Sequence, residues 1–375
     1  MKFSSVLGHK AVKERLLVSG RDERVSHALL FLGPEGAGSL PLVIAFAQYL
    51  NCEQPLEDDS CGTCSSCIKM EKLVHPDVHF SYPVVTSKKF DKPKSVDYIE
   101  QFRAAFKHNP YMSYSDWMEE ITTDNKQGSI FVQESADINQ RLSLKGVEGK
   151  YKIVIIWYAE KMNAIAANKL LKILEEPPES TLFFLVSERY EELLATVTSR
   201  SQLIKVNRLG DAELSQVLVE KHGLDKIAAR HVAHRSDGSY NQALKIVNND
   251  SAIADLNQQF LYWMRHCLKL NVSGINDLSV QFNDEPKEAQ KVFLRHSLNI
   301  VRECLVINYG DRSLVRLEGK DLEDITRFAP FVTANNAEDF ISELNKAHFH
   351  LERNANTKLL FTDLSLSLCQ VLSKK

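Results

Sequence analysis

The chain has 375 residues, of which 44% are hydrophobic and 25% charged, and these values are typical of a globular protein rather than a disordered or fibrous one. Its length exceeds what one hydrophobic core usually organises and suggests two or three domains. With 46 basic and 49 acidic side chains the formal net charge is -3, which excludes a strong overall attraction to nucleic-acid backbones or anionic lipid.

The termini and the cysteines indicate a compartment. There is no apolar run of 18 or more residues, and no signal-like apolar segment follows Met1. Four of the seven cysteines lie between Cys52 and Cys67, and an odd total clustered in this way favours metal binding over a disulfide framework. We therefore expect a cytoplasmic protein with no membrane association.

The first clear element is an apolar run, ALLFL at residues 28–32, which predicts a buried strand. The sequence GPEGAGSL at residues 33–40 follows, and a helix should come next. A working P-loop of the form GxxxxGK[ST] needs backbone amides around the phosphates, a lysine for the β/γ oxygens and a hydroxyl for Mg²⁺. The glycines that keep this register are Gly33, Gly36 and Gly38. Because Ser39 and Leu40 replace the lysine and the hydroxyl residue, we interpret the segment as a degenerate P-loop, with a plain glycine turn as the alternative.

A cysteine-rich insert occupies residues 52–67. Cys52, Cys61, Cys64 and Cys67 offer four soft thiolates, the ligand set that Zn²⁺ prefers in a closed tetrahedral structural site. A closed shell of four sulfurs leaves no open position for water, so we expect one structural zinc ion rather than a catalytic one. An iron–sulfur cluster and a set of unliganded thiols are the alternatives.

The next segment is an expected strand at residues 78–82, followed by an irregular stretch at residues 83–129. We interpret this stretch as a partly ordered insertion with an amphipathic helix expected at 96–106. The sequence does not indicate a function for it. It carries a group of lysines, Lys88, Lys89, Lys92 and Lys94. One interpretation is that these lysines are solvated surface side chains. The alternative is that they contact phosphates in a zinc-containing DNA-binding repair protein.

A second motif follows the expected strand at residues 153–156. In P-loop ATPases the corresponding strand ends in carboxylates that hold Mg²⁺ and polarise water. Here Trp157 and Tyr158 stand in those places, and Glu160 comes too late in the sequence. Since neither aromatic side chain can coordinate a hard cation, the sequence predicts a degenerate acidic motif and no functional ATP site.

The remaining elements indicate the fold class. An amphipathic helix should end at residues 175–176, because Pro177 and Pro178 cannot continue it, and strands are expected at 181–186 and 203–206. Strands that alternate with helices predict an α/β fold with a parallel sheet. After about residue 209 the pattern is helical, so we place domain boundaries near 208 and 250.

Several segments together carry a family resemblance: SHALLF at 26–31, the four-cysteine insert, KLLKILEEPP at 169–178 and TSRS at 198–201. With these the chain resembles the delta-prime subunit family of bacterial DNA polymerase III, a branch of the AAA+ clamp-loader proteins. The resemblance implies an AAA+ α/β domain at 1–208, a small helical lid at 209–250 and a helical collar for oligomerisation at 251–375.

The resemblance also bears on catalysis. Catalytic subunits of this kind keep the P-loop lysine and the acidic pair, whereas delta-prime members commonly lack them. Asn241 stands where the lid of an active subunit would carry a sensor arginine, and Ser201 replaces the usual cysteine after Arg200. The resemblance implies that Arg200 acts in trans on the ATP site of a neighbouring subunit, where a planar cation would stabilise transferring phosphoryl charge. A plain surface arginine is the alternative.

The implied partners are gamma/tau-like ATPase subunits and a delta-like subunit, assembled in a hetero-pentamer that places a sliding clamp on primer-template DNA. In that complex we expect this chain to be a stator without intrinsic ATPase activity. An active gamma/tau-like ATPase subunit and a zinc-containing DNA-binding repair protein remain the alternatives.

Overall fold

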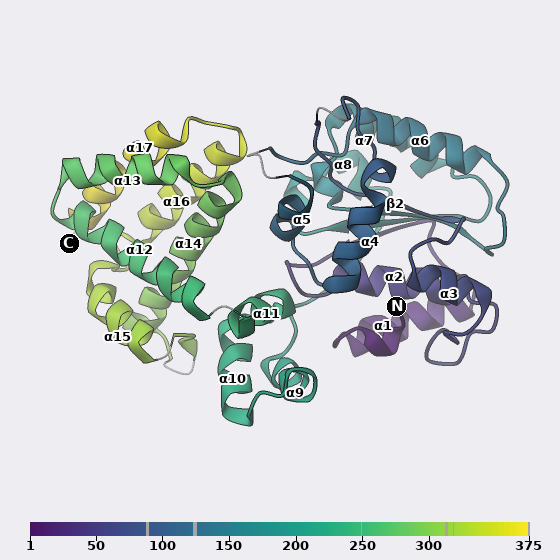
Figure 1. The fold of residues 1–375 in the computed structure, drawn as a ribbon, viewed down its shortest axis with the longest axis horizontal. Helices are drawn as coiled ribbons and strands as arrows, with labels where there is room; N and C mark the ends of the chain where they lie inside the picture. The colour runs from purple at the N-terminus through teal and green to yellow at the C-terminus, as the bar shows by residue number, and fades with distance from the viewer. Residues whose placement is uncertain (88–89, 123–125, 249, 312–313, 318, 374–375) are drawn as a thin grey trace. The chain divides into compact units, whose positions relative to one another are not determined.

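The computed structural model describes residues 1–87, 90–122, 126–248, 250–311, 314–317 and 319–373. These residues form two compact units, Met1–Leu244 and Lys245–Lys375 (Figure 1). The first unit contains a β-sheet with helices, and the second is built from helices throughout its described part. Among the described helices, none combines the length and apolar character needed to cross a membrane.

The sheet of the first unit has five strands in the order β2-β3-β4-β1-β5, and every pairing is parallel. In the register, Leu30 lies opposite Leu185 on one side and Leu203 on the other. The strands are β1 (Ala28–Leu32), β2 (Val78–Ser81), β3 (Lys152–Trp157), β4 (Thr181–Ser187) and β5 (Gln202–Lys205). All five predicted strands and the parallel α/β class are therefore confirmed.

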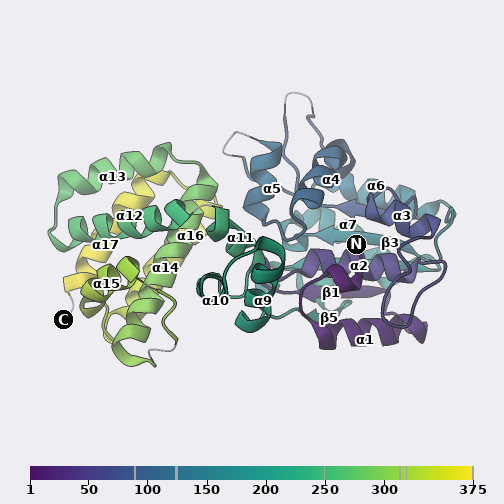
Figure 2. The same ribbon diagram turned by 60° about the horizontal axis from the view of Figure 1, so that its bottom comes forward.

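Helices cover both faces of the sheet (Figures 1 and 2). On one face α1 (Lys10–Arg21) and α2 (Ser39–Leu50) share a hydrophobic core with strand residues such as Phe184. On the other face α6 (Val132–Ser143), α7 (Ala164–Glu175) and α8 (Ala195–Thr198) pack against the alternate strand residues, including Phe183. Successive strand side chains point to opposite faces, which explains the continuous apolar runs in the sequence. The predicted end of α7 before the two prolines is confirmed.

The insertion at residues 83–129 contains regular helices in its described part. It contains the short 3₁₀ helix η2 (Ser95–Tyr98), α4 (Ile99–His108) and α5 (Tyr114–Ile121). The expected helix at 96–106 is thus confirmed, whereas α5 was not predicted. Two of its aromatic rings pack with Tyr82, the residue just before it: Phe102 stacks on Tyr82 with centroids 4.1 Å apart, and Trp117 meets both rings edge-on.

Three helices follow the sheet: α9 (Asp211–His222), α10 (Lys226–Arg235) and α11 (Tyr240–Asn248). The helices α9 and α10 pack against each other, and the chain turns into α11 through Gly238, whose carbonyl accepts a hydrogen bond from Leu209 N. Up to Leu244 these helices belong to the first compact unit. Their separation as a lid domain at 209–250 stays a prediction.

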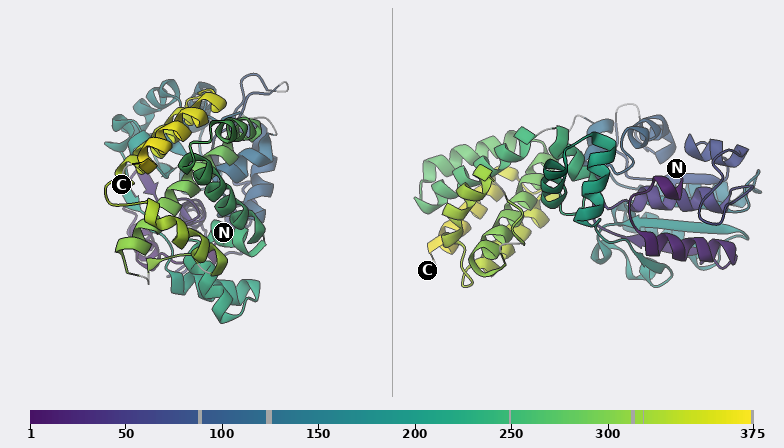
Figure 3. Two further views of the ribbon diagram at one scale, coloured as in Figure 1. Left: turned by 90° about the vertical axis from the view of Figure 1, so that its left-hand side faces the viewer. Right: turned by 90° about the horizontal axis from the view of Figure 1, so that it is seen from below.

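The second unit, coloured green to yellow in Figure 3, has its own hydrophobic core. In it Phe282 stacks on Phe361 with centroids 4.4 Å apart, and the Trp263 Nε1–H donates to Ser365 Oγ at 2.8 Å. The three cysteines outside the cluster, Cys267, Cys304 and Cys369, are buried here. The helices are α12 (Asp250–Leu268), α13 (Val272–Asp284), α14 (Lys287–Tyr309), α15 (Gly319–Phe328), α16 (Ala337–Glu352) and α17 (Thr357–Ser373).

Candidate functional site

The glycine loop lies between β1 and α2, at the carboxyl edge of the sheet. Gly36 and Gly38 have φ values of 72° and 99°, in the left-handed region that favours glycine. The N–H of Gly33 donates to Ser187 O at 3.1 Å and so joins the loop to the end of β4. The strand–loop–helix geometry of a P-loop is therefore present.

The two residues that replace the lysine and the hydroxyl residue are both buried in the first turn of α2. The side chain of Leu40 is part of the hydrophobic core that contains α1 and α2. Ser39 Oγ is buried and has no hydrogen-bond partner within the described part of the chain. Mg²⁺ keeps several waters and carboxylate ligands when it binds proteins, and Leu40 offers it an apolar wall instead.

Trp157 and Tyr158 are core residues as well, each only 4% exposed. The Trp157 ring packs against Phe102 of the insertion, with ring centroids 5.8 Å apart. Tyr158 has the left-handed φ of 56°; its hydroxyl donates to Glu188 Oε1 at 2.7 Å and accepts from Tyr114 N at 2.7 Å. Burial, together with the nearby Glu188 carboxylate, raises the pKa of Tyr158 well above its usual value, so the hydroxyl is neutral. The edge of β3 is thus occupied by packed aromatic rings.

Glu160, the nearest carboxylate after β3, lies in the short helix η3 (Ala159–Lys161). Its Oε1 accepts a hydrogen bond from Glu188 N at 3.0 Å, and burial raises its pKa. The cleft beside the glycine loop is lined by Glu188 instead, together with residues 110–112 of the insertion and the ends of β3 and β4. It encloses about 350 Å³ of empty space, part of it open to solvent. Sequence reasoning missed Glu188 and Tyr111, because neither belongs to a motif.

Asn241, at the position of the implied sensor arginine, is buried against the insertion. Its Oδ1 accepts from Asn109 Nδ2 at 2.6 Å, and its Nδ2 donates to Asp116 Oδ2 at 2.7 Å. Both halves of the amide are therefore used in contacts between α11 and the α4–α5 segment. No motif in the sequence predicted Asn109 and Asp116 as hydrogen-bond partners of Asn241.

Arg200 follows α8 at the surface, with its side chain 32% exposed. Its guanidinium forms an ion pair with Glu175, the last residue of α7, and donates to Thr196 O at 2.8 Å. These contacts hold the arginine on a defined surface next to the end of α7. An exposed ion pair contributes little to stability, so the guanidinium can leave Glu175 at small cost.

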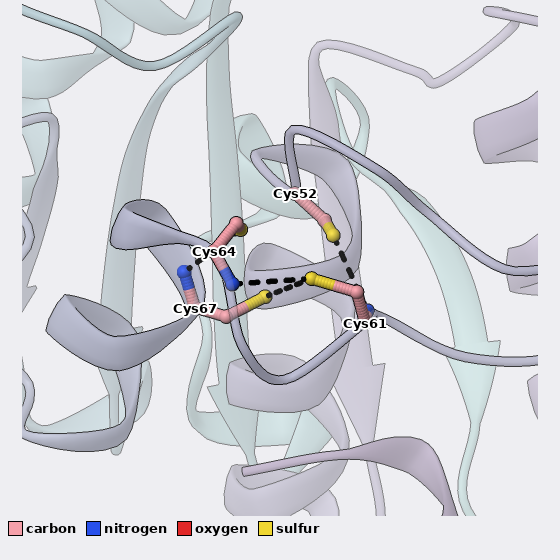
Figure 4. Close-up of side chains that lie close together, drawn as sticks. All are labelled: Cys52, Cys61, Cys64 and Cys67. Atoms are coloured by element: carbon pink, nitrogen blue, oxygen red, sulfur yellow. Dashed lines mark hydrogen bonds between the residues drawn. The ribbon is translucent and has the colours of Figure 1, made fainter.

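The four clustered cysteines converge on one point (Figure 4). Their sulfur atoms all lie within 4.8 Å of one another, and the Cys61 and Cys67 sulfurs are 3.8 Å apart. A tetrahedron with metal–sulfur bonds of about 2.3 Å places its sulfurs about 3.8 Å from each other. All four thiols are free of disulfide bonds. The donor set therefore fits a thiophilic metal ion, and the cluster could hold one.

Backbone N–H groups support the same interpretation. Cys61 Sγ accepts hydrogen bonds from the N–H groups of Thr63 and Cys64, and Cys64 Sγ accepts from Cys67 N as the cap of α3 (Ser65–Glu71). These donors lower the pKa of the Cys61 thiol to about 6. Such N–H donors favour the thiolate, which is the form that binds a metal. Gly62, with φ 79°, makes the turn between the ligands.

The cysteine loop also fixes the N-terminal segment. The Asp59 carboxylate accepts hydrogen bonds from Phe3 N at 2.9 Å and Ser4 N at 3.0 Å. On the other side, Gln48 Nε2 of α2 donates to Ser60 Oγ at 2.9 Å. Although burial opposes ionisation, the backbone donors hold the pKa of Asp59 below its usual value. The loop thus ties residues 3–5 to the helix that follows the glycine loop.

Of the lysine group Lys88, Lys89, Lys92 and Lys94, the structure describes Lys92 and Lys94. Lys94 Nζ lies 2.9 Å from Asp137 Oδ1, so this lysine is ion-paired within the first unit. Lys92 is exposed, and Lys88 and Lys89 lie outside the described residues. The DNA-binding alternative therefore has one described lysine, Lys92, left at the surface.

The parallel sheet in the order β2-β3-β4-β1-β5, with a glycine loop between β1 and α2, defines an AAA+ type P-loop fold. The chain belongs to the family described as DNA polymerase III, delta subunit, which matches residues 8–210. It is 27% identical to DNA polymerase III subunit delta' of Bacillus subtilis, over 95% of both chains. It is also 32% identical to the subunit delta' of Escherichia coli, over 51% of this chain and 45% of that protein.

Other relatives carry a different subunit name. The chain is 27% identical to DNA polymerase III subunit gamma/tau of Mycobacterium tuberculosis, over 53% of this chain and 27% of that protein. Among solved structures, a DNA polymerase III gamma subunit-related protein of Thermotoga maritima covers 95% of this chain at 17% identity, with a TM-score of 0.38.

The glycine loop generates a stability prediction. A Cβ at Gly36 would lie 2.0 Å from Ser239 Oγ, and the backbone there has a positive φ. Gly36→Ala should therefore lower the free energy of unfolding of the first unit by about 1–3 kcal/mol, measured by urea denaturation. Gly146→Ala is the matched control, because its Cβ would meet no atom closer than 3.6 Å. Equal stability of the two variants would contradict the loop geometry.

Proposed function

We propose that this chain is a non-catalytic, delta-prime-like subunit of a replicative clamp loader. The observation that supports the proposal best is that the positions for Mg·ATP chemistry are core positions. Leu40, Trp157 and Tyr158 are buried in one hydrophobic cluster, and Ser39 beside them carries no charge. The chain keeps the fold of a nucleotide-binding domain without the groups that would hold Mg²⁺ or the γ-phosphate.

Relatives named delta' and relatives named gamma/tau both match this chain, so family membership alone leaves an active ATPase subunit open. The residues at the glycine loop and at the end of β3 favour the first alternative. A catalytic subunit would need a cation and at least one carboxylate facing the cleft near the loop. Glu188 does line the cleft, but its carboxylate accepts the Tyr158 hydroxyl.

In the proposed complex this subunit is a stator beside gamma/tau-like ATPase subunits and a delta-like subunit in a hetero-pentamer. The complex would act on a sliding clamp and primer-template DNA. The helical second unit would serve as the collar, and the Arg200 guanidinium would reach the ATP site of the neighbouring subunit. The ion pair with Glu175 would keep that arginine extended along the surface until the neighbour is present.

Nucleotide binding by the isolated chain tests the proposal. The isolated chain should bind Mg·ATP with a Kd weaker than about 1 mM and should not hydrolyse it, because lysine, hydroxyl and acidic ligands are all missing. Isothermal titration calorimetry and a phosphate-release assay would measure both properties, with the gamma/tau-like subunit of the same loader as the positive control. Turnover by the pure chain would contradict the proposal and favour the active ATPase.

Substitution of Arg200 tests the proposed trans role. In the assembled loader, Arg200→Ala should reduce the ATPase rate stimulated by clamp and DNA by about tenfold or more, since an arginine offered in trans stabilises phosphoryl charge. Arg21→Ala, which removes another surface arginine paired with a glutamate, is the matched control. Glu175→Ala should keep the stimulated rate, because it frees the guanidinium. An Arg200→Ala loader as active as the Arg21→Ala loader would remove the trans role.

For the cysteine cluster, we propose that the metal is one structural zinc ion. Purified protein should contain zinc at close to one per chain by elemental analysis, and Cys61→Ser should lose most of it. Cys304→Ser is the control, since that cysteine is buried in the second unit and should leave the zinc content unchanged. Iron in place of zinc, or neither metal, would overturn the assignment.

A further inference from the structure

The ring of Tyr111 lies directly against the glycine loop. A Cβ added at Gly38 would come within 2.7 Å of Tyr111 Cε1, so the ring touches the backbone at the N-terminus of α2. In a working P-loop, that backbone is where N–H groups bind phosphate. Tyr111 belongs to the insertion and is buried, which means that part of this chain occupies the space beside the phosphate cradle.

Tyr111 is held in place from three sides. Its hydroxyl accepts a hydrogen bond from Leu7 N at 2.7 Å, and its own N–H donates to Asn109 Oδ1 at 3.0 Å. Its ring meets the ring of Tyr240, the first residue of α11, edge-on with centroids 4.9 Å apart. These contacts fix the ring in the wall of the cleft that borders the glycine loop.

The residue after Tyr240 completes the connection. Asn241 is 1% exposed and bonds to both Asn109 and Asp116 of the insertion, at 2.6 and 2.7 Å. In addition, Tyr240 N donates to Gly36 O at 3.1 Å, so the start of α11 is bonded to the glycine loop itself. These contacts join the glycine loop to the start of α11, the start of α11 to the insertion, and the insertion, through Tyr111, to the glycine loop.

We infer that Asn109, Tyr111, Asp116, Tyr240 and Asn241 form an internal latch, which fixes the start of α11 on the glycine loop in the absence of any ligand. The insertion supplies a ring that packs against the glycine loop, and the first residue of α11 is hydrogen-bonded to the same loop. Buried polar networks whose members are all satisfied fix one arrangement of the elements they join. The inference adds to the proposed function and rests on it, because the proposed function states that no nucleotide binds at the glycine loop.

Hydrogen–deuterium exchange of the full chain tests the latch, read out at peptides that cover residues 236–242 and 1–9. In Asn241→Ala the amide of Tyr240 should exchange at least tenfold faster than in the wild type, because the bonds that hold α11 to the insertion are lost. In Tyr111→Ala the amides of Leu7 and Tyr240 should both exchange faster. Peptides from β1 and β4 should be unchanged in both variants.

Lys107→Ala is the matched control, since Lys107 is an exposed residue of α4 outside the latch. In this variant the exchange rates of the Tyr240 and Leu7 amides should stay within about twofold of the wild type. If Asn241→Ala does not fold, Asn109→Ala removes one of its bonds at a partly exposed site and should give the same direction of change. Unchanged Tyr240 exchange in the folded variants, or an unprotected Tyr240 amide in the wild type, would overturn the latch. Mg·ATP binding by the wild-type chain would instead contradict the proposed function, so the two failures are distinct.

Discussion

The Tyr158 hydroxyl joins three parts of the first unit at the carboxyl edge of the sheet. It donates to Glu188 after β4 and accepts from Tyr114 at the start of α5, while its ring packs beside Trp157 at the end of β3. A buried donor and acceptor that are both satisfied stabilise their surroundings, whereas an unpaired carboxylate at the same place would cost several kcal/mol. Through Tyr114, this junction ties the insertion to the ends of β3 and β4.

Much of the fold was predictable from the sequence, because its signals are local. Apolar runs predicted β1, β3 and β4, shorter stretches predicted β2 and β5, and the spacing of the four cysteines predicted the metal-binding cluster. The sequence also showed that the P-loop lysine and the acidic residues after β3 are replaced, at Ser39, Leu40, Trp157 and Tyr158. In each case the relevant residues lie within a short stretch of chain, so their pattern carries the information.

The sequence could not predict what replaces the missing groups. Asn109, Tyr111 and Asp116 come from the insertion, whose irregular pattern predicted only one helix. Asn109 and Asp116 bond to Asn241, and Tyr111 packs on Tyr240, more than a hundred residues further along the chain. Likewise, the carboxylate of Asp59 contacts backbone groups of Phe3 and Ser4, which no motif marks. Contacts of this kind depend on tertiary packing, and a single sequence does not encode them in any spacing.

The burial of Trp157 and Tyr158 has a consequence for how such a chain can change over time. Both side chains now support the insertion, so a substitution of either by aspartate or glutamate would place an uncompensated charge among aromatic rings. A lysine at Ser39 would gain nothing without those acids. On the proposed function, a gain of ATPase activity would need several simultaneous substitutions, each harmful by itself, so single substitutions at these positions would be disfavoured.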